Sequence, residues 1–338
     1  MSDTLRRRHP LSLIRGGRRF RRPNRRATHV QPDEPAIRSI EYDGKRWIDI
    51  RRPDSDVLDE IGAEFNLHPL LLEDITSRIQ RPKIDVYDDY LFIVMQFPIH
   101  DKESRENASA EIDFVVGRDF FMTVHDGSLR PLTTMVDSVF DSDEMSIKLL
   151  ERTPGHLLYE VVDRLVDYVV PIAPRLELRV ERIEEMIFQA QAMETVQEIS
   201  LVRRDLISLR RILKPQLPIL NRFELGNLPF LEDEIDDYWG DVADHLGRTN
   251  DSIEELAEIL AALSDTHDTL ISQRMNDIIK TLTIFSVLLL PLTLVSGFFG
   301  MNVPLPGQDE PLTTIVVITF MLCVSLAMLV YFRKRRWL

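Results

Sequence analysis

The sequence predicts an α+β domain, then long helices, then two C-terminal membrane-spanning helices. Short β-type runs alternate with helical pieces up to about residue 139, and long charged helical patterns follow residue 156. Residues 281–308 carry no charged side chain, and residues 312–332 form a second uncharged run of 21 residues. A bilayer core of about 30 Å needs about 20 apolar residues as a helix, so each run can span it. Two buried core helices are the alternative, but such helices rarely run so far without a charge.

Residues 1–36 predict a disordered tail. They are punctuated by prolines, and residues 1–26 hold ten arginines against Asp3. A solvated arm is the plainest interpretation. Contact with anionic membrane lipid comes next, because each basic residue near such a surface contributes ~1 kcal/mol. A mitochondrial transit peptide is also rich in arginine, but this tail contains few serines.

Residues 37–150 predict the α+β domain, and residues 151–240 a helical region. Spacing and β-branched content favour strands at residues 47–50, 90–97, 112–116 and 120–124, and a helix at 54–65. Pro215 and Pro218 are expected to break the helical pattern. The chain has no phosphate-cradling glycine loop, no HExxH and no nucleophile–base motif, so we expect no enzyme and no cofactor.

Residues 241–280 predict a stalk helix. Apolar residues recur by heptad in two rows, Leu246, Ile253 and Leu260, and Leu256, Leu263 and Leu270. This pattern is typical of a helix that packs lengthwise on others. No proline occurs between Pro229 and Pro291, so the stalk can continue into a first span at residues 281–300. Together they would make one helix of about 90 Å at 1.5 Å per residue.

Charge predicts the orientation in the membrane. The loop at residues 301–311 is short and carries only Asp309 and Glu310, whereas residues 333–338, after the second span at 312–332, are basic. By the positive-inside rule, both termini and the large body are cytoplasmic, in a multi-pass protein of the cell membrane. The body is acidic enough to give the whole chain a net charge of −14, which attracts cations. Cys323 is the only cysteine, which excludes disulfides and thiolate zinc clusters within one chain.

One face of the first span has the features of a pore lining. Its residues, spaced 3, 4, 4 and 3 apart, are Ile279, Leu282, Ser286, Leu290 and Thr293. Extended toward the loop, the face reaches Gly300 and Asn302. Several copies with this face turned inward would enclose a narrow apolar tube with a hydroxyl ring and an amide ring. Ordinary helix packing in a bundle would explain the spacing equally well.

Several motifs together resemble the CorA family of divalent-cation transport proteins. Gly300-Met301-Asn302 closes the first span, and the chain ends in a basic segment followed by Trp337-Leu338. The further matching segments are Met275-Asn276-Asp277, Leu282-Thr283-Ile284, Pro291-Leu292-Thr293, Leu67-His68-Pro69-Leu70, Leu72-Glu73-Asp74-Ile75 and Gln80-Arg81-Pro82-Lys83. The resemblance covers roughly residues 60–338.

The resemblance implies a homopentameric, funnel-shaped channel for Mg²⁺, with Co²⁺ and Ni²⁺ as further substrates. The first span would line the pore, and Gly300, Met301 and Asn302 would form its external mouth. The implied chemistry is sound, because Mg²⁺ sheds water reluctantly and neutral amide oxygens can hold its water shell without stripping it.

The resemblance also implies cytoplasmic sensing sites in which Mg²⁺ is a regulatory ligand. Asp74 and Asp265 match two aspartates that face each other between subunits. Glu73, Asp163, Asp241 and His245 match a neighbouring site by context. Without the resemblance, these residues resemble ordinary surface acids and an i,i+4 pair. Two facing carboxylates repel, and a divalent ion reverses that repulsion, so cytoplasmic Mg²⁺ is expected to hold the pore shut.

Two alternatives remain open. The external loop, residues 303–310, departs from the acidic segment common in the family, which leaves room for a zinc transporter of the ZntB-like branch. A membrane-anchored signalling protein or enzyme is the other alternative, but an anchor needs no polar stripe in its spans. The expected partners are divalent cations, membrane lipid and further copies of the chain, with no nucleic acid.

Overall fold

The computed structural model describes residues 24–27, 36–77, 80–100, 107–189, 192–231, 235–301 and 311–335. The chain divides into two compact units. The first contains the described residues of 1–185 and 196–260, and the second contains those of 186–195 and 261–338. The boundary near residue 260 lies inside a single helix, so this helix belongs to both units.

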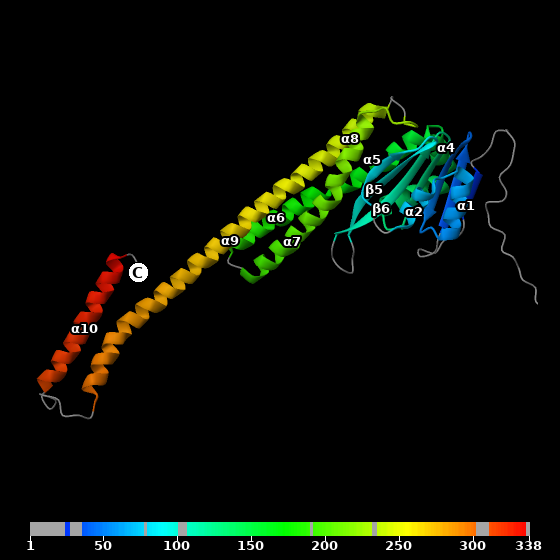
Figure 1. Cartoon of the computed structure of the whole chain (residues 1–338). Coiled ribbons are helices and arrows are strands. Elements are labelled where there is room, and N and C mark those ends of the chain that lie inside the picture. Colours follow the sequence, from blue (N-terminus) through cyan, green and yellow to red (C-terminus); the bar gives the residue numbers. More distant parts are fainter. Residues whose placement is uncertain are drawn as a thin grey trace, which may run out of the picture. The chain divides into compact units, whose positions relative to one another are not determined.

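A seven-stranded mixed sheet is the centre of the first unit (Figure 1). The strands are β1 (Asn24–Ala27), β2 (Ala36–Tyr42), β3 (Lys45–Arg51), β4 (Lys83–Val86), β5 (Tyr90–His100), β6 (Asn107–Gly117) and β7 (Phe120–His125). Their order is β1-β2-β3-β7-β6-β5-β4, and all neighbours are antiparallel except β3 and β7. The four predicted strands are confirmed as parts of β3, β5, β6 and β7.

Strand β1 corrects one expectation. The sequence predicts disorder throughout residues 1–36, but Asn24–Ala27 pairs in antiparallel register with β2. An edge strand can be rich in charged residues, so the arginine content of this segment does not exclude a strand. The rest of the expected tail, residues 1–23 and 28–35, lies outside the described residues.

Helices cover both faces of the sheet (Figure 1). On one face lie α1 (Ser55–Phe65) and α2 (Pro69–Thr76), and on the other lie α3 (Arg130–Asp141), α4 (Asp143–Leu150) and α5 (Pro154–Val169). Ile61 of α1 and Leu71 of α2 pack with Ile48 of β3 in one hydrophobic core. Successive residues of a strand point to opposite faces of the sheet, so Trp47 of β3 lies on the other face. On the opposite face, Trp47 packs against Phe140 of α3 with ring centroids 6.2 Å apart.

Local signals explain where these elements begin and turn. The side chain of Asp54 accepts a hydrogen bond of 2.9 Å from the Val57 amide and caps the predicted helix, now α1. Between β2 and β3, Asp43 and Gly44 both have positive φ. This geometry is the tight hairpin turn that an Asp-Gly pair favours.

The predicted helical region contains a hairpin of two long helices and a shorter one. These are α6 (Ile172–Phe188), α7 (Ala192–Leu213) and α8 (Leu217–Glu224), with a 3₁₀ turn at Lys214–Gln216. Pro215 and Pro218 each stand in the first turn of a helical segment, so they interrupt the pattern as expected.

A single helix of 64 residues, α9 (Asp236–Phe299), contains the stalk and the first apolar run. It begins before the expected residue 241 and has Pro291 in its interior. Leu246, Ile253 and Leu260 are at most 1% exposed, so this heptad row packs as predicted. Trp239 contacts Phe223 of α8, with ring centroids 4.5 Å apart.

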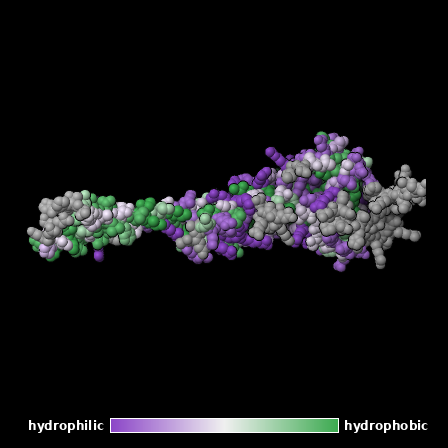
Figure 2. Space-filling model, turned by 90° about the horizontal axis from the view of Figure 1, so that it is seen from below, coloured by the Kyte–Doolittle hydropathy of each residue, from purple (hydrophilic) through white to green (hydrophobic). Residues whose placement is uncertain are grey.

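The second apolar run forms α10 (Pro311–Lys334). By length and composition, α10 and the C-terminal part of α9 can each cross a membrane. Hydrophobic side chains gather over both of these segments, whereas the first unit shows many hydrophilic ones (Figure 2). The fold is therefore a soluble domain with a long helix and two C-terminal helices that can span a bilayer.

Candidate ion pathway and cation-binding residues

The predicted pore face of α9 is exposed along its whole length. Ile279 is 54%, Leu282 66% and Leu290 69% exposed, and Ser286 and Thr293 are exposed as well. No described residue of the second unit buries this face. Large apolar side chains left uncovered in such a row must be covered in the functional protein, either by membrane lipid or by other copies of the chain.

A different side of α9 packs against α10. Thr283 and Val287 of α9 line an apolar groove with Val324, Ala327 and Met328 of α10. Near this groove, Ile284 and Phe332 are each only 6% exposed. Since residues 283, 284 and 287 take this contact, the face of 282, 286 and 290 stays free for further copies of the chain.

The hydroxyl groups on this exposed face donate hydrogen bonds to backbone carbonyls of their own helix. Ser286 Oγ donates to the Leu282 carbonyl at 2.9 Å, and Thr293 Oγ1 donates to the Leu289 carbonyl at 2.9 Å. Each hydroxyl oxygen therefore presents only lone pairs to its surroundings. A hydrated cation points its water hydrogens outward, so acceptors of this kind suit its water shell.

The end of the first span is described only up to Met301. Gly300 and Met301 are exposed, and the Gly300 amide donates to the Ser296 carbonyl at 2.9 Å. Asn302, together with Asp309 and Glu310, lies outside the described residues.

Asp74 is held at the edge of the sheet by α2. Pro69 begins this helix, and the His68 ring accepts a hydrogen bond from the Leu70 amide at its N-terminus. Leu71 is fully buried, and Asp74 follows three residues later on the same side of the helix, half-buried. Glu73, beside it, is exposed.

Lys83 of β4 forms an ion pair with Asp74. Its Nζ atom is 2.6 Å from Asp74 Oδ2 and 2.7 Å from Asp85 Oδ2. The same ammonium lies 5.3 Å from the centroid of the Phe92 ring. Burial lowers the pKa of Lys83, but its hydrogen bonds to the two aspartates outweigh this, so the pKa is raised.

Two further carboxyl groups stand behind this contact on β6. Burial, together with the charges of Glu111 and Asp74, raises the pKa of Asp113 well above its ordinary value. Asp113 is 5% exposed, and its Oδ1 atom has no hydrogen-bond partner among the residues that the structure describes. Burial also raises the pKa of Glu111, whose Oε2 accepts a hydrogen bond of 2.5 Å from the Gln80 amide.

Lys83, Glu111 and Asp113 are not among the site residues that the sequence predicts. One signal was present, because Asp113 interrupts the apolar run of residues 112–116. An ionisable residue inside such a strand is buried at a cost and needs an explanation.

Three members of the second predicted site do lie together, between α5 and α9. Burial raises the pKa of Asp163, and Asp167 and Glu160 raise it further, while His245 opposes them. Asp241 Oδ1 lies 3.7 Å from His245 Nε2. Burial and the charge of Asp163 raise the pKa of the neighbouring Tyr159 to about 12.

The remaining predicted ligands are not part of that group. Glu73 lies on α2, and Asp265 is exposed on α9 in the second unit. Among the described residues, no three His, Cys, Asp or Glu side chains converge closely enough to hold a metal ion. A cation held by these residues would therefore be completed by water or by groups from another copy of the chain.

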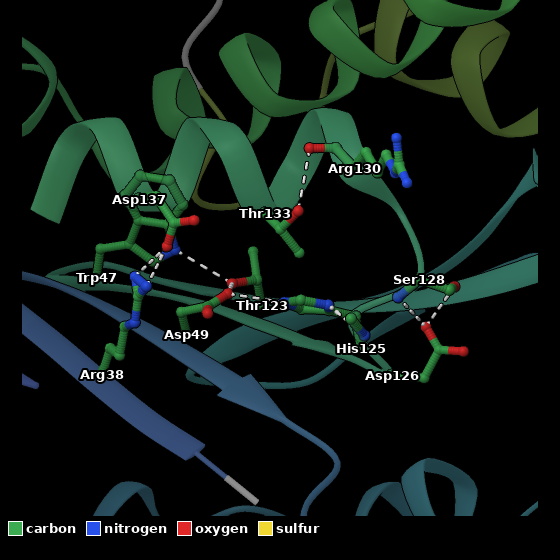
Figure 3. Close-up of polar contacts among 11 residues, drawn as sticks. Arg38, Trp47, Asp49, Thr123, His125, Asp126, Ser128, Arg130, Thr133 and Asp137 are labelled. Carbon is green, nitrogen blue, oxygen red and sulfur yellow. Dashed lines mark hydrogen bonds and ion pairs between the residues drawn. The ribbon is translucent and has the colours of Figure 1, made fainter. Parts of the chain in front are cut away.

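A separate polar network is buried under α3 and belongs to neither site (Figure 3). Thr123 Oγ1 and His125 Nε2 both contact Asp49 Oδ1, at 2.7 and 3.0 Å. The Gly127 amide donates to His125 Nδ1 at 2.9 Å, so Nε2 carries the hydrogen that Asp49 accepts. Arg38 and Asp137 form an ion pair beside this network.

Comparison with known proteins supplies relatives for this arrangement. The family model described as CorA-like Mg²⁺ transporter protein matches residues 42–334. Over 290 residues, the chain is 29% identical to the cobalt/magnesium transport protein CorA of Thermotoga maritima, covering 84% of this chain and 80% of that protein. Over 242 residues, it is 26% identical to the zinc transport protein ZntB of Pectobacterium atrosepticum, covering 69% of this chain and 71% of that protein.

Among solved structures, the CorA magnesium transporter from Methanocaldococcus jannaschii has the same fold. The two superpose with a TM-score of 0.77 over 93% of this chain and 98% of the other, at 19% sequence identity. The likeness extends over nearly the full length of both chains, and at this identity it speaks for the fold alone.

Proposed function

The chain belongs to the CorA-like Mg²⁺ transporter family, and from this premise we propose that it admits Mg²⁺ to the cytoplasm through a pore lined by α9. As a member of this family it is a membrane-bound divalent-cation transporter, and we expect transport rather than enzymatic catalysis. The finer proposal concerns the ion, the assembly and the gate. Co²⁺ and Ni²⁺ are proposed as further substrates, because their hydrated ions resemble hydrated Mg²⁺ in size and charge.

The uncovered face of α9 is the observation that carries this proposal. Its exposed apolar and hydroxyl residues need a covering, and α10 packs against other residues of the helix. Five copies with this face turned inward would bury it around a common axis, and we propose that homopentamer. Membrane lipid would then surround the outer side of α10.

The proposed pore combines apolar constrictions with rings of acceptors. Rings of Leu282 and Leu290 would exclude water when narrow, which is one way in which channels close. Rings of Ser286 and Thr293 would accept hydrogen bonds from the ion's water shell. Gly300, Met301 and Asn302 are proposed as the external mouth, with both termini and the soluble domain on the cytoplasmic side.

We further propose that cytoplasmic Mg²⁺ closes the pore. Asp74 and Asp265 are proposed to share an ion between neighbouring subunits, and Glu73, Asp163, Asp241 and His245 to form a second site. The half-buried position of Asp74 and the grouping of Asp163, Asp241 and His245 support these roles.

Ion uptake by proteoliposomes tests the proposal. Purified protein should take up Mg²⁺, and also Co²⁺ and Ni²⁺, without needing a pH gradient, whereas an Asn302→Ala variant of equal assembly should not. The resemblance to ZntB favours Zn²⁺ as the second candidate substrate. Uptake of Zn²⁺ alone, or uptake only with a pH gradient, would replace the magnesium-channel proposal by a zinc transporter or a proton-coupled one.

A further inference from the structure

We propose that Lys83 is a tethered counter-ion that occupies Asp74 when no divalent cation is bound, and that a divalent cation must displace it. The inference rests on the proposed role of Asp74 as a cation ligand. Its geometric basis is the short contact of Lys83 Nζ with Asp74 Oδ2, at 2.6 Å. This atom takes up one side of the carboxylate on which a cation would bind, and its positive charge repels a cation there, so the two compete for Asp74.

Lys83 is positioned to fill this place. Its Nζ atom is shared between Asp74 and Asp85, and the ammonium also lies near the face of the Phe92 ring. The Lys83 side chain is 31% and the Asp74 side chain 25% exposed, so water screens this pair less than a pair at the open surface. The pair is therefore a built contact and not two solvated charges that happen to meet.

The sheet places further acidic groups beside the contact of Lys83 with Asp74. Lys83 of β4 and Asp113 of β6 stand opposite the same residue of β5, Val94, so they lie in one row across the sheet. Glu111 adds a second carboxyl group on β6. Burial favours the uncharged form of Asp113, because it raises the pKa of that carboxyl group. The ammonium of Lys83 therefore chiefly offsets the charges of Asp74 and Asp85, until a divalent ion takes its place at Asp74.

After displacement from Asp74, the Lys83 ammonium would still have a second partner. Asp85 already accepts a hydrogen bond from Lys83 at 2.7 Å, so Nζ can leave Asp74 and remain paired. The exchange replaces one unit of positive charge at Asp74 by two. Lys83 thus sets the cation concentration at which Asp74 is occupied, because every binding event must first break its ion pair.

The test is the Mg²⁺ concentration that half-protects the full-length protein from protease in detergent. Lys83→Met removes the charge but keeps an unbranched stem over Phe92. It should lower this midpoint about three- to tenfold, since a competing cation has been removed. Lys83→Arg keeps the charge and should stay near the wild type. Lys214→Met is the matched control, because Lys214 pairs with Glu254 at 3.0 Å and its loss removes the same charge elsewhere.

The dependence on Asp74 decides between competition and a general charge effect. In an Asp74→Asn background, Lys83→Met should no longer lower the midpoint. Equal midpoints for the wild type and Lys83→Met would overturn the inference, and so would a decrease that persists without Asp74 or that Lys214→Met reproduces. Melting in EDTA verifies that each variant is folded before the comparison.

The outcomes separate this inference from the proposed function. If the wild type transports no ion, the transport proposal fails, but the comparison of midpoints keeps its meaning. If Mg²⁺ protects only Lys83→Met, the inference holds and the proposed sensing by the wild type fails. If Mg²⁺ protects neither protein, the inference is wrong.

Discussion

At the scale of single residues, the direction of each polar hydrogen decides what a site can bind. Ser286 and Thr293 give their hydrogens to their own helix and turn acceptors outward. In the soluble domain, the Asp49 carboxylate instead accepts hydrogen bonds from Thr123 and His125. The first arrangement suits a passing hydrated cation, and the second fixes a buried core.

Thr293→Val tests the acceptor ring. Valine keeps the shape of threonine but offers no lone pair, so a water shell at this level loses a hydrogen bond. Mg²⁺ uptake into proteoliposomes should fall about three- to tenfold, as the loss of a hydrogen bond of ordinary strength implies. The control is Thr319→Val, because Thr319 is on α10 and bonds its helix in the same way, at 2.7 Å. Equal rates for the two variants would contradict the assignment of the pore face.

Asp49→Ala tests the buried network. Burial alone would raise the pKa of Asp49, but its contact with His125 and the hydrogen bond from the Thr123 hydroxyl outweigh it, so the pKa is lowered. Removing the carboxylate leaves two buried donors without their acceptor and should cost about 2–4 kcal/mol at neutral pH. Thermal unfolding in detergent, followed by tryptophan fluorescence, measures this loss.

The pH dependence of that loss has a definite sign. A group whose folded-state pKa is lowered stabilises the fold above its unfolded-state pKa, about 3.9 for aspartate, and this stability disappears as pH falls through the folded value. The difference in free energy of unfolding between the wild type and Asp49→Ala should therefore decrease below about pH 4. Asp137→Ala is the control, since its partly exposed pair with Arg38 should contribute at most about 1 kcal/mol.

At the scale of helices and strands, α9 has a different environment at each end. Its first part packs by heptad in the soluble unit, and its last part carries apolar side chains outward, as a membrane-spanning helix does. Pro291 lies within this last part and cannot donate to the carbonyl four residues earlier. The turn between Val287 and Pro291 therefore lacks one backbone hydrogen bond and is the part of the helix where a bend is expected.

Ile253→Ala tests the packed part of α9. Ile253 is fully buried in a heptad row, so truncation should leave a cavity and destabilise the soluble unit by about 2–4 kcal/mol. Ile259→Ala on the same helix should cost less than about 1 kcal/mol, because Ile259 is 42% exposed. Chemical unfolding followed by Trp239 fluorescence compares them, and equal losses would show that the heptad row is not the packing face.

Strong local patterns made much of the fold predictable. Strands β3, β5, β6 and β7 and the heptad row of α9 follow from β-branched runs and apolar spacing. Strands β1, β2 and β4 were missed. β1 and β4 are only four residues long, and an arginine-rich edge strand resembles a solvated tail. Short edge strands form only because a neighbouring strand is present, and a local pattern does not contain that neighbour.

The candidate site was predictable only in part, for a related reason. Asp74 and the pore face stand in recognisable motifs. The pairing of Asp74 with Lys83 arises because α2 packs on the sheet edge where β4 runs. The row that includes Asp113 arises from the register of β4, β5 and β6. Asp74 and Lys83 are only nine residues apart, but they belong to a helix and a strand whose packing no sequence spacing predicts. Asp113 lies further along the chain and joins them only through the strand register.

At the scale of the whole molecule, the proposed function needs several chains. One chain exposes a pore face but encloses nothing, and its described residues do not converge into a metal site. Assembly would cover the exposed face of α9 and would complete the metal site. Ion conduction and cation sensing would then depend on the same event, the meeting of neighbouring subunits.

Replacing both Asp74 and Asp265 by Asn tests that dependence. The change removes most of the repulsion between the two residues and most of the affinity for the ion, so closure should lose its response to cytoplasmic Mg²⁺. In excised patches, millimolar-range Mg²⁺ should suppress the wild-type current strongly and the variant current much less. Equal suppression would show that the sensor lies elsewhere, with Asp163, Asp241 and His245 as the next group to replace.

The uninterrupted course of α9 through both units has a consequence for how this protein can change in length. Each residue added to a helix rotates everything beyond it by about 100°. One extra residue near Asp265 would turn Leu282, Ser286 and Leu290 away from their direction, although every side chain remained present. Seven extra residues would restore that direction to within about 20°. Insertions and deletions in α9 should therefore be tolerated in steps of seven, whereas the loops of the soluble domain can vary one residue at a time.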